Sequence, residues 1–525
     1  MLEGNHDHNR KYTATAEVIE ELKKIKDIAF PIAAMSVVTY LKGIISVVCM
    51  GRLSRLDLAG GALAIGFTNI TGYSVLSGLS MGMDPLCSQG FGSRNLLLVS
   101  VTLQRTIIML LFASIPISLL WLNLEQIMVK LHQNPDIARV ASLYCRYALP
   151  DLIANSLLFP LRIYLRSKGT PWPLFWCTFL GVIFHLPITI FLAFKLHLGV
   201  PGVAVSTFLT NFNILIFLFG YMYFNTSHPS SDDEDDYEHR QQEFLYTTSP
   251  LLFSSPSGPS PPSCSPSSSY SSSASSSASS TSSSSSCLGK PTITFTTLLS
   301  KDWWVLLRLA ISSCLAVCLE WWWYEFMTLL AGYINPPHVT LAASAIVIQT
   351  TSLMYTLPTS LSASVSTRVG NELGASRHGR ARLASLVAMI LSVLASILGF
   401  LWTTLARDPW GRVFTQDTEV LELTIAVLPI IGLCELGNCP QTTGCGVLRG
   451  TARPSTGAGI NLYSFYLVGT PIAIFLAFVM KLGFAGLCYG LLAAQIVCAF
   501  SIITVICKTD WERESLKAKD LVGGI

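Results

Sequence analysis

Twelve apolar stretches, each about as long as a bilayer is thick, constrain this chain more than any other feature. A helix rises 1.5 Å per residue, so ~20 apolar residues cross a hydrocarbon core of ~30 Å. Six stretches lie within residues 28–224 and six within residues 303–507. The fourth is the weakest, because Arg146 and Asp151 interrupt it. We therefore predict an all-α integral membrane protein with twelve transmembrane helices.

The composition excludes several other classes of protein. Charged residues make up 12% of the chain, about half of the ~25% typical of soluble domains. The net charge of +3 is too small for a nucleic-acid-binding surface. The 14 cysteines are scattered, mostly in apolar stretches, without the spacing of a zinc site or a disulfide framework. We expect no cofactor and no metal.

Polar segments flank and separate the two apolar halves. The tails span residues 1–27 and 508–525, and the first has no cleavable signal pattern. Residues 225–302 hold an acidic run and a long Ser/Pro tract, which cannot bury enough apolar area to offset its ordering entropy. We predict a disordered linker there. Two interpretations stay open: a passive tether, or a regulatory segment that is phosphorylated by kinases or docks adaptor proteins.

The distribution of Lys and Arg predicts the orientation in the membrane. These residues concentrate in the tails, the linker and the loops after even-numbered spans, with the densest cluster at Arg368, Arg377, Arg380 and Arg382. Basic loops stay on the cytosolic side. Both termini and the linker are therefore expected to face the cytosol.

The two halves resemble each other at an offset of 282–284 residues. The segment PITIFLAFKLHLGVPG (187–202) matches PIAIFLAFVMKLGFAG (471–486), and LRSKGTP (165–171) matches LRGTARP (448–454). Each half has an even number of spans, so both enter the membrane from the same side as parallel repeats. Such repeats commonly enclose a substrate cavity near the midplane, which favours a transporter over a channel or a receptor.

At this level of detail the chain resembles a known family, the multidrug and toxic compound extrusion (MATE) transporters, in their plant detoxification-type branch. The resemblance covers essentially all twelve spans. Its most specific motifs are MGMDPLCSQGFGS (81–93), CLEWWWYE (318–325), STRVGNELGA (366–375) and CPQTTGCGVLRGTARP (439–454).

The resemblance implies two lobes of six helices, 28–224 and 303–507, and cation-coupled efflux of organic solutes by alternating access. For the plant branch it implies protons as the coupling ion. One departure concerns the first span. Several prokaryotic relatives carry a working Asp there, whereas this chain has no acid and holds Lys42 instead. The resemblance therefore directs attention to acids of the second lobe.

Glu320 lies in the middle of the seventh span. An acid within the membrane is costly and usually functional, and a low-dielectric cavity favours the neutral form of a carboxyl group. Glu320 is therefore the predicted proton carrier, against the alternative of a structural hydrogen-bonding acid. Tyr324 shares its helix face at i+4, whereas Glu325 lies ~140° around the helix. Tyr324 is predicted to bond the carboxyl or to contact an aromatic substrate.

Glu435 is the second predicted proton-binding acid, with Asn438 on the same helix face. The repeat places Asn155 over Asn438 and Asp151 next to the position of Glu435. We expect these polar positions, together with Gln349, to line the substrate cavity: Asn438, Asn155, Asp151 and Gln349. Asp84, in Asp84–Pro85, is interpreted as a helix-end feature at the cytosolic face.

The leading hypothesis is a monomeric, proton-coupled antiporter that exports xenobiotics, secondary metabolites or hormones. It would act in the plasma membrane, the vacuolar membrane or an endosomal or Golgi membrane. Two alternatives remain: a signalling scaffold that acts through the linker, and a lipid-linked oligosaccharide flippase, which would need a cavity rich in Arg and Lys. No phosphate-binding loop and no catalytic constellation occurs, so we expect neither ATP-driven pumping nor an enzyme.

Overall fold

The computed structural model describes residues 3–130, 133–227 and 303–523, and every regular element in these ranges is a helix. Residues 228–302, most of the predicted linker, lie outside the described residues. The first half comprises α1 (Glu3–Leu53), α2 (Arg55–Thr68), α3 (Ser74–Ser80), α4 (Asp84–Gly92), α5 (Leu96–Leu122), α6 (Leu124–Lys130), α7 (Pro135–Ser167), α8 (Trp172–Ile190) and α9 (Val200–Ser227). The prediction of an all-α fold is confirmed.

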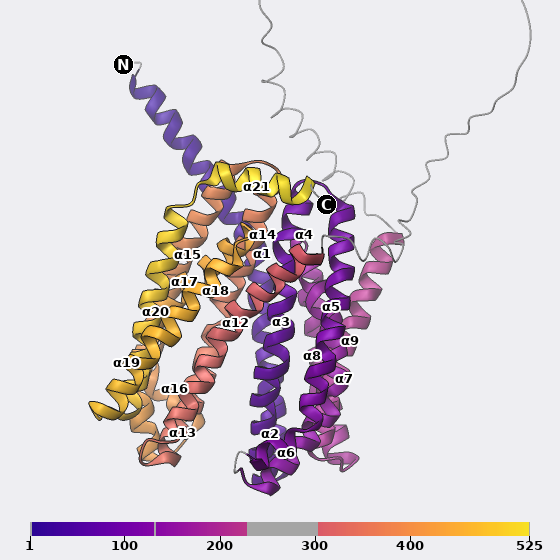
Figure 1. Cartoon of the computed structure of the whole chain (residues 1–525), viewed down its shortest axis with the longest axis vertical. Coiled ribbons are helices and arrows are strands. Elements are labelled where there is room, and N and C mark those ends of the chain that lie inside the picture. Colours follow the sequence, from indigo (N-terminus) through magenta and orange to yellow (C-terminus); the bar gives the residue numbers. More distant parts are fainter. Residues whose placement is uncertain (1–2, 131–132, 228–302, 524–525) are drawn as a thin grey trace, which may run out of the picture. The chain divides into compact units, whose positions relative to one another are not determined.

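The second half repeats this order (Figure 1). It comprises α12 (Trp303–Ala331), α13 (Pro337–Met354), α14 (Thr356–Gly374), α15 (His378–Leu405), α16 (Arg407–Phe414), α17 (Thr418–Gly450), α18 (Pro454–Asn461), α19 (Thr470–Ile474), α20 (Gly483–Cys507) and α21 (Trp511–Gly523). Short 3₁₀ or π segments continue several of these helices: Asn69–Tyr73, Met81–Met83, Phe191–Lys195, Leu462–Gly469 and Phe475–Val479.

Eleven of the helical segments in the described ranges are long and apolar enough to cross a membrane. Each coincides with a predicted span. The remaining predicted span, the fourth, is α7, a helix of 33 residues. Its length is sufficient, but charged residues along it, among them Arg146 and Asp151, lower its hydropathy. The sequence thus located the weak span correctly, and its weakness lies in its polar side chains rather than in its helical structure.

Each half has its own apolar core. In the first half, Trp121, Leu152 and Val203 belong to one buried cluster that draws on α5, α7 and α9. In the second half, Trp323 and Phe465 belong to another, with residues of α17 and α20. A smaller buried cluster joins α4 and α7 of the first half to α12, so the contact between the halves has an apolar part of its own.

The two halves meet where α4 packs against α14, and also where α12 packs against α3 and α1 against α14 (Figure 1). A Cβ atom on Gly92 would lie 2.1 Å from the backbone oxygen of Asn371. A Cβ atom on Gly374 would lie 2.1 Å from the backbone oxygen of Gln89. These two contacts are equivalent under the sequence repeat. Glycine is required at both positions because the backbones approach too closely for any side chain.

Asp84 joins the halves at the same place. It begins α4, as the sequence suggested, but it is also fully buried. Its carboxylate lies 2.7 Å from Arg166 Nη2 of α7 and accepts a hydrogen bond of 2.7 Å from Ser366 Oγ of α14. Arg449 Nε of α17 is 3.8 Å away. Asp84 is therefore an ionic hub between the two halves as well as a helix-end residue.

Candidate functional site: buried carboxylates in the second half

Glu320 is buried in the middle of α12. This helix runs from Trp303 to Ala331 without a Pro or Gly, so its hydrogen-bond ladder is unbroken around the acid. The side chain is 5% exposed. Its Oε2 accepts a hydrogen bond of 3.2 Å from Gln441 Nε2, whereas Oε1 has no partner among the residues that the structure describes. One oxygen is thus held in place and the other is available to a proton.

Glu435 lies on α17 and is 1% exposed. Its Oε2 accepts a hydrogen bond of 3.0 Å from Asn438 Nδ2, and Cys439 Sγ approaches to 3.8 Å. Asn438 Oδ1 in turn accepts a bond of 3.2 Å from Thr442 Oγ1. Glu435 and Asn438, which the sequence places on one helix face, are hydrogen-bonded to each other, and α17 carries both this pair and Gln441, the partner of Glu320.

The two acids belong to one electrostatic cluster. The charges of Glu435 and Arg449 both act on Glu320, and both acids act on Tyr324. Tyr324 thus lies within the field of both carboxyls, but in the described part of the chain its hydroxyl donates no hydrogen bond to either. Tyr355, at the junction of α13 and α14, also lies within the field of Glu320.

Asp151 and Asn155 form a separate network in the first half. Asn155 Nδ2 donates to Asp151 Oδ2 over 2.9 Å, which repeats the acid–amide pair of α17 on α7. Tyr73 Oη donates to the same oxygen over 2.7 Å, and Asn211 Nδ2 donates to Oδ1 over 2.7 Å. Asn211 Oδ1 accepts a bond of 3.0 Å from Lys42 Nζ.

Two residues considered in the sequence, Gln349 and Glu325, lie outside both networks. Gln349 lies on α13 with an exposed side chain, and its backbone oxygen accepts a bond of 3.3 Å from Tyr40 Oη. Glu325 is partly buried on α12. Among the three consecutive tryptophans of α12, Trp323 is buried in the core, whereas Trp321 and Trp322 are each 39% exposed.

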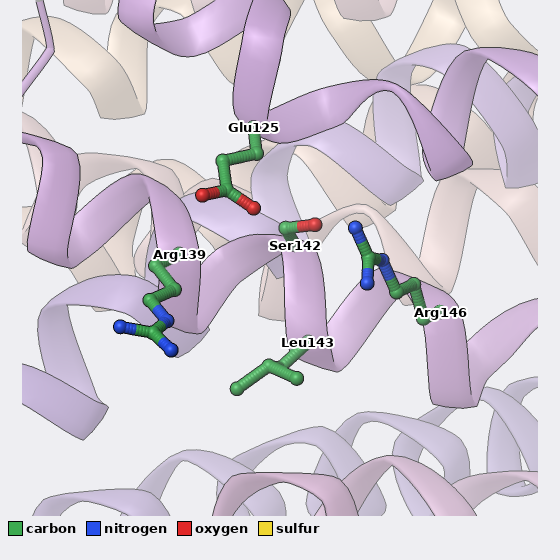
Figure 2. Close-up of a pocket in the computed structure, with 5 residues that line it drawn as sticks. All are labelled: Glu125, Arg139, Ser142, Leu143 and Arg146. Carbon is green, nitrogen blue, oxygen red and sulfur yellow. The ribbon is translucent and has the colours of Figure 1, made fainter.

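A hollow of about 330 Å³ lies elsewhere, on α6 and α7 (Figure 2). Its lining residues are Glu125, Arg139, Ser142, Leu143 and Arg146. None of the predicted site residues is among them. Near the buried acids, a void of about 10 Å³ lies between α12 and α17, lined by residues that include Ser313, Cys445 and Arg449. Across the described ranges, no group of three or more His, Cys, Asp or Glu side chains could hold a metal ion.

The pseudo-repeated halves, each with a buried acid–amide pair, match one family over most of both halves. Residues 31–191 and 312–475 match the MatE family. The chain belongs to the MATE family. It is therefore a multi-pass integral membrane protein, a MATE transporter and not an enzyme.

Plant relatives of the MATE family are similar over almost the whole length. Protein DETOXIFICATION 55 of Arabidopsis thaliana is 57% identical over 517 residues, which cover 98% of this chain and 93% of that protein. Protein DETOXIFICATION 51 of Arabidopsis thaliana is 45% identical over 516 residues, which cover 98% of this chain and 86% of that protein. The resemblance to the plant detoxification-type branch is thereby confirmed.

Solved MATE structures share the fold. The crystal structure of the eukaryotic MATE transporter AtDTX14 matches with a TM-score of 0.81 at 27% identity, over 96% of this chain and 100% of that one. The Vibrio cholerae MATE transporter VcmN, in its bent form, matches with a TM-score of 0.68 at 14% identity, over 96% of this chain and 99% of that one. The all-helical membrane fold is thus that of MATE transporters.

Sequence reasoning missed Gln441, Tyr73 and Asn211. Gln441 could have been found, because it lies at i+3 from Asn438 and continues the polar face of α17. Tyr73 and Asn211 carry no comparable signal. Each lies among other polar residues, with Thr71 and Ser74 beside Tyr73 and Thr210 and Asn213 beside Asn211, so nothing local singles it out. Its partner Asp151 is distant in the sequence.

Proposed function

We propose that this MATE transporter is a proton-coupled antiporter that exports small organic solutes by alternating access, with Glu320 as the proton carrier. The observation that carries the proposal is the asymmetric environment of Glu320. One carboxyl oxygen is bonded to Gln441, and the other is buried without a partner in the described part of the chain. A buried carboxyl oxygen that accepts no hydrogen bond can carry a proton instead. The protonated carboxyl group of Glu320 would then be a hydrogen-bond donor.

Loading the proton would change the charge balance of the cluster. Two carboxylates in one low-dielectric cluster repel each other, so neutralising Glu320 relieves a repulsion with Glu435. Arg449 provides a link to the contact between the halves, because it acts on Glu320 and also lies 3.8 Å from Asp84. We propose that protonation of Glu320 strengthens the ion pair between Arg449 and Asp84, and that deprotonation weakens this ion pair.

The void between α12 and α17 offers a route for the proton. It lies along the same two helices, with Ala316 one helical turn before Glu320 and Cys445 one turn after Gln441. Its volume of about 10 Å³ is close to the least that can hold one water molecule. We propose that a water molecule at Ser313 or Arg449 relays the proton to Glu320.

The remaining assignments follow from the sequence. We propose that both termini and the linker face the cytosol, and that Tyr324, Asn438, Asn155, Asp151 and Gln349 contribute to the substrate pathway. The transporter would act in the plasma membrane, the vacuolar membrane or an endosomal or Golgi membrane. Exported substrates would be xenobiotics, secondary metabolites or hormones, with kinases or adaptor proteins acting on the linker.

The test is the Glu320→Gln variant, assayed by substrate flux in sealed vesicles with an imposed pH gradient. Gln keeps the shape of the side chain and its bond with Gln441 but cannot exchange a proton. Flux driven by the gradient should fall to background, with normal amounts of protein in the membrane. Glu325→Gln is the matched control, because it removes a partly buried acid from the same helix. Wild-type accumulation by Glu320→Gln would refute the proposal.

A further inference from the structure

The hollow on α6 and α7 belongs to neither polar network, and the proton mechanism does not use it (Figure 2). Its volume of about 330 Å³ is at the lower end of the ~300–1,000 Å³ typical of small-molecule sites. Its lining residues are Glu125 of α6 and Arg139, Ser142, Leu143 and Arg146 of α7. Two cations, one acid and one hydroxyl group thus share one small cavity.

The charged side chains of the hollow have no partners within the protein. In the described part of the chain, Glu125, Arg139 and Arg146 form no ion pair and no hydrogen bond. The two arginines are seven positions apart, which is about two turns, so they flank Ser142 on one side of α7. A guanidinium group offers five N–H donors, and a carboxylate offers two acceptor oxygens. These groups are therefore available to a ligand that carries both signs of charge.

Ser142 adds a buried polar group to the wall of the hollow. The residue is 1% exposed, and its Oγ has no hydrogen-bond partner among the residues that the structure describes. A serine within a helix can donate to the carbonyl group one turn earlier, as Ser156 of the same helix does to Leu152 over 2.7 Å. Ser142 makes no such bond. In Figure 2 its hydroxyl lies between the carboxylate of Glu125 and the guanidinium of Arg146.

The second half shows what this region looks like when its charges are paired. At an offset of 283 residues, within the range of the repeat, Glu125 of α6 coincides with Asp408 of α16. Asp408 accepts a hydrogen bond of 3.0 Å from Arg412, one turn later in the same helix. The position equivalent to Arg412 is Val129. The acid is therefore present in both halves, but only α16 supplies a cation for it.

Apolar side chains next to the hollow are exposed. The helix α6 follows directly after α5, whose apolar span ends at Leu122, so the hollow lies near the end of a membrane-spanning helix. On α7, Leu143 is 38% exposed and Tyr147 is 49% exposed, one turn apart on the same face. Exposed apolar side chains of a membrane-spanning helix contact acyl chains. A ligand with a charged head and an apolar tail therefore fits this place.

We propose that the hollow binds the headgroup of an aminophospholipid, a lipid that carries a phosphate and a primary ammonium group. The phosphate oxygens accept hydrogen bonds from Ser142 and from the guanidinium groups on either side of it, and the ammonium group donates to Glu125. The acyl chains lie along the exposed apolar side chains of α7. This site is separate from the proposed export function, because none of its residues exchanges the transported proton.

The first test compares three lipids with identical oleoyl chains: phosphatidylethanolamine, phosphatidylcholine and phosphatidylglycerol. Native mass spectrometry of the full-length protein, titrated with each lipid in detergent, gives the dissociation constants. A choline headgroup has no N–H to donate to Glu125, and a hydrogen bond to a charged group corresponds to roughly tenfold in affinity. Phosphatidylethanolamine should therefore bind roughly tenfold more tightly than phosphatidylcholine. Equal affinities, or tighter binding of phosphatidylglycerol, would overturn the proposal.

Substitutions then separate the two ends of the headgroup. Glu125→Gln should remove the preference for phosphatidylethanolamine over phosphatidylcholine, whereas Arg146→Gln should weaken the binding of both lipids, because both carry the phosphate. Arg412→Gln is the matched control, because it removes an exposed arginine that is already paired on the equivalent helix α16, and it should bind like the wild type. A preference that survives Glu125→Gln, or equal weakening in Arg146→Gln and Arg412→Gln, would contradict the assignment.

A soluble competitor distinguishes a lipid from a free headgroup. Glycerophosphoethanolamine carries the same charged groups without acyl chains, so it cannot cover Leu143 and Tyr147. Burial of one large apolar side chain corresponds to roughly tenfold in affinity, and the competitor should bind more weakly than phosphatidylethanolamine by at least that factor. Equal affinity of the two compounds would show that the ligand is a soluble phosphoethanolamine and would overturn the lipid site.

Discussion

Replacing Asp84 with Asn should loosen the contact between the two halves. The carboxylate is fully buried, lies 2.7 Å from Arg166 of its own half, and accepts a bond of 2.7 Å from Ser366 of the other half. The variant keeps the size of the side chain but leaves Arg166 and Arg449 without a buried counter-charge. Breaking a buried ion pair by removing one partner costs about 3–5 kcal/mol.

Only part of that free-energy cost acts between the two halves. Arg166 moves with Asp84, so the contribution across the contact comes from the bond with Ser366 and from Arg449 at 3.8 Å. A hydrogen bond to a charged group is worth about 1.5–3 kcal/mol, which corresponds to roughly a tenfold to hundredfold shift in equilibrium. The state in which the halves have separated at α4 and α14 should become more populated by that factor.

Hydrogen–deuterium exchange with mass spectrometry measures this shift. Amides of α4 and α14 should exchange faster in Asp84→Asn, while those of α20, in the core of the second half, should be unchanged. Asp136→Asn is the matched control, because it neutralises an exposed acid in the first turn of α7. Unchanged exchange in α4 and α14 would refute the argument, and faster exchange throughout the protein would indicate general unfolding instead.

Three further substitutions test other contacts. Gly374→Ala should weaken the contact of α4 with α14, because the added Cβ atom would lie 2.1 Å from a backbone oxygen, and thermal stability in detergent should fall relative to Gly379→Ala, where nothing lies within 4 Å. Arg368→Gln should lower the melting temperature more than Arg382→Gln. Arg368 makes two bonds of 2.8 Å to the buried carboxylate of Glu21 on α1, whereas Arg382 is exposed. Glu435→Gln should change the pH dependence of vesicle flux rather than abolish flux, and complete loss would show that Glu435 carries the proton itself.

The sequence was sufficient for the fold because the spans are local patterns. A stretch of about 20 apolar residues is evident from composition alone, and each predicted span has a helix in the structure. The acids could also be predicted, since a carboxyl group within an apolar stretch is conspicuous and has a physical cost.

The partners of these acids could not be predicted in the same way. The bond from Gln441 to Glu320 spans 121 positions, and the bond from Lys42 to Asn211 spans 169. No local spacing encodes such pairs, because they depend on how the helices pack. Lys42 illustrates the limit. The sequence showed that it replaces an acid in the first span, but only the structure shows that a bridging amide separates it from Asp151.

The paired glycine contacts between α4 and α14 have a consequence for how the chain can be divided. Because Gly92 meets Asn371 and Gly374 meets Gln89 in equivalent ways, this contact has the form of an isologous dimer interface built within one polypeptide. Residues 1–227 and 303–525, expressed together as two separate chains, should therefore assemble without a covalent connection. A substitution at either glycine removes only one of the two equivalent contacts, so a compensating change has to be made on the opposite fragment.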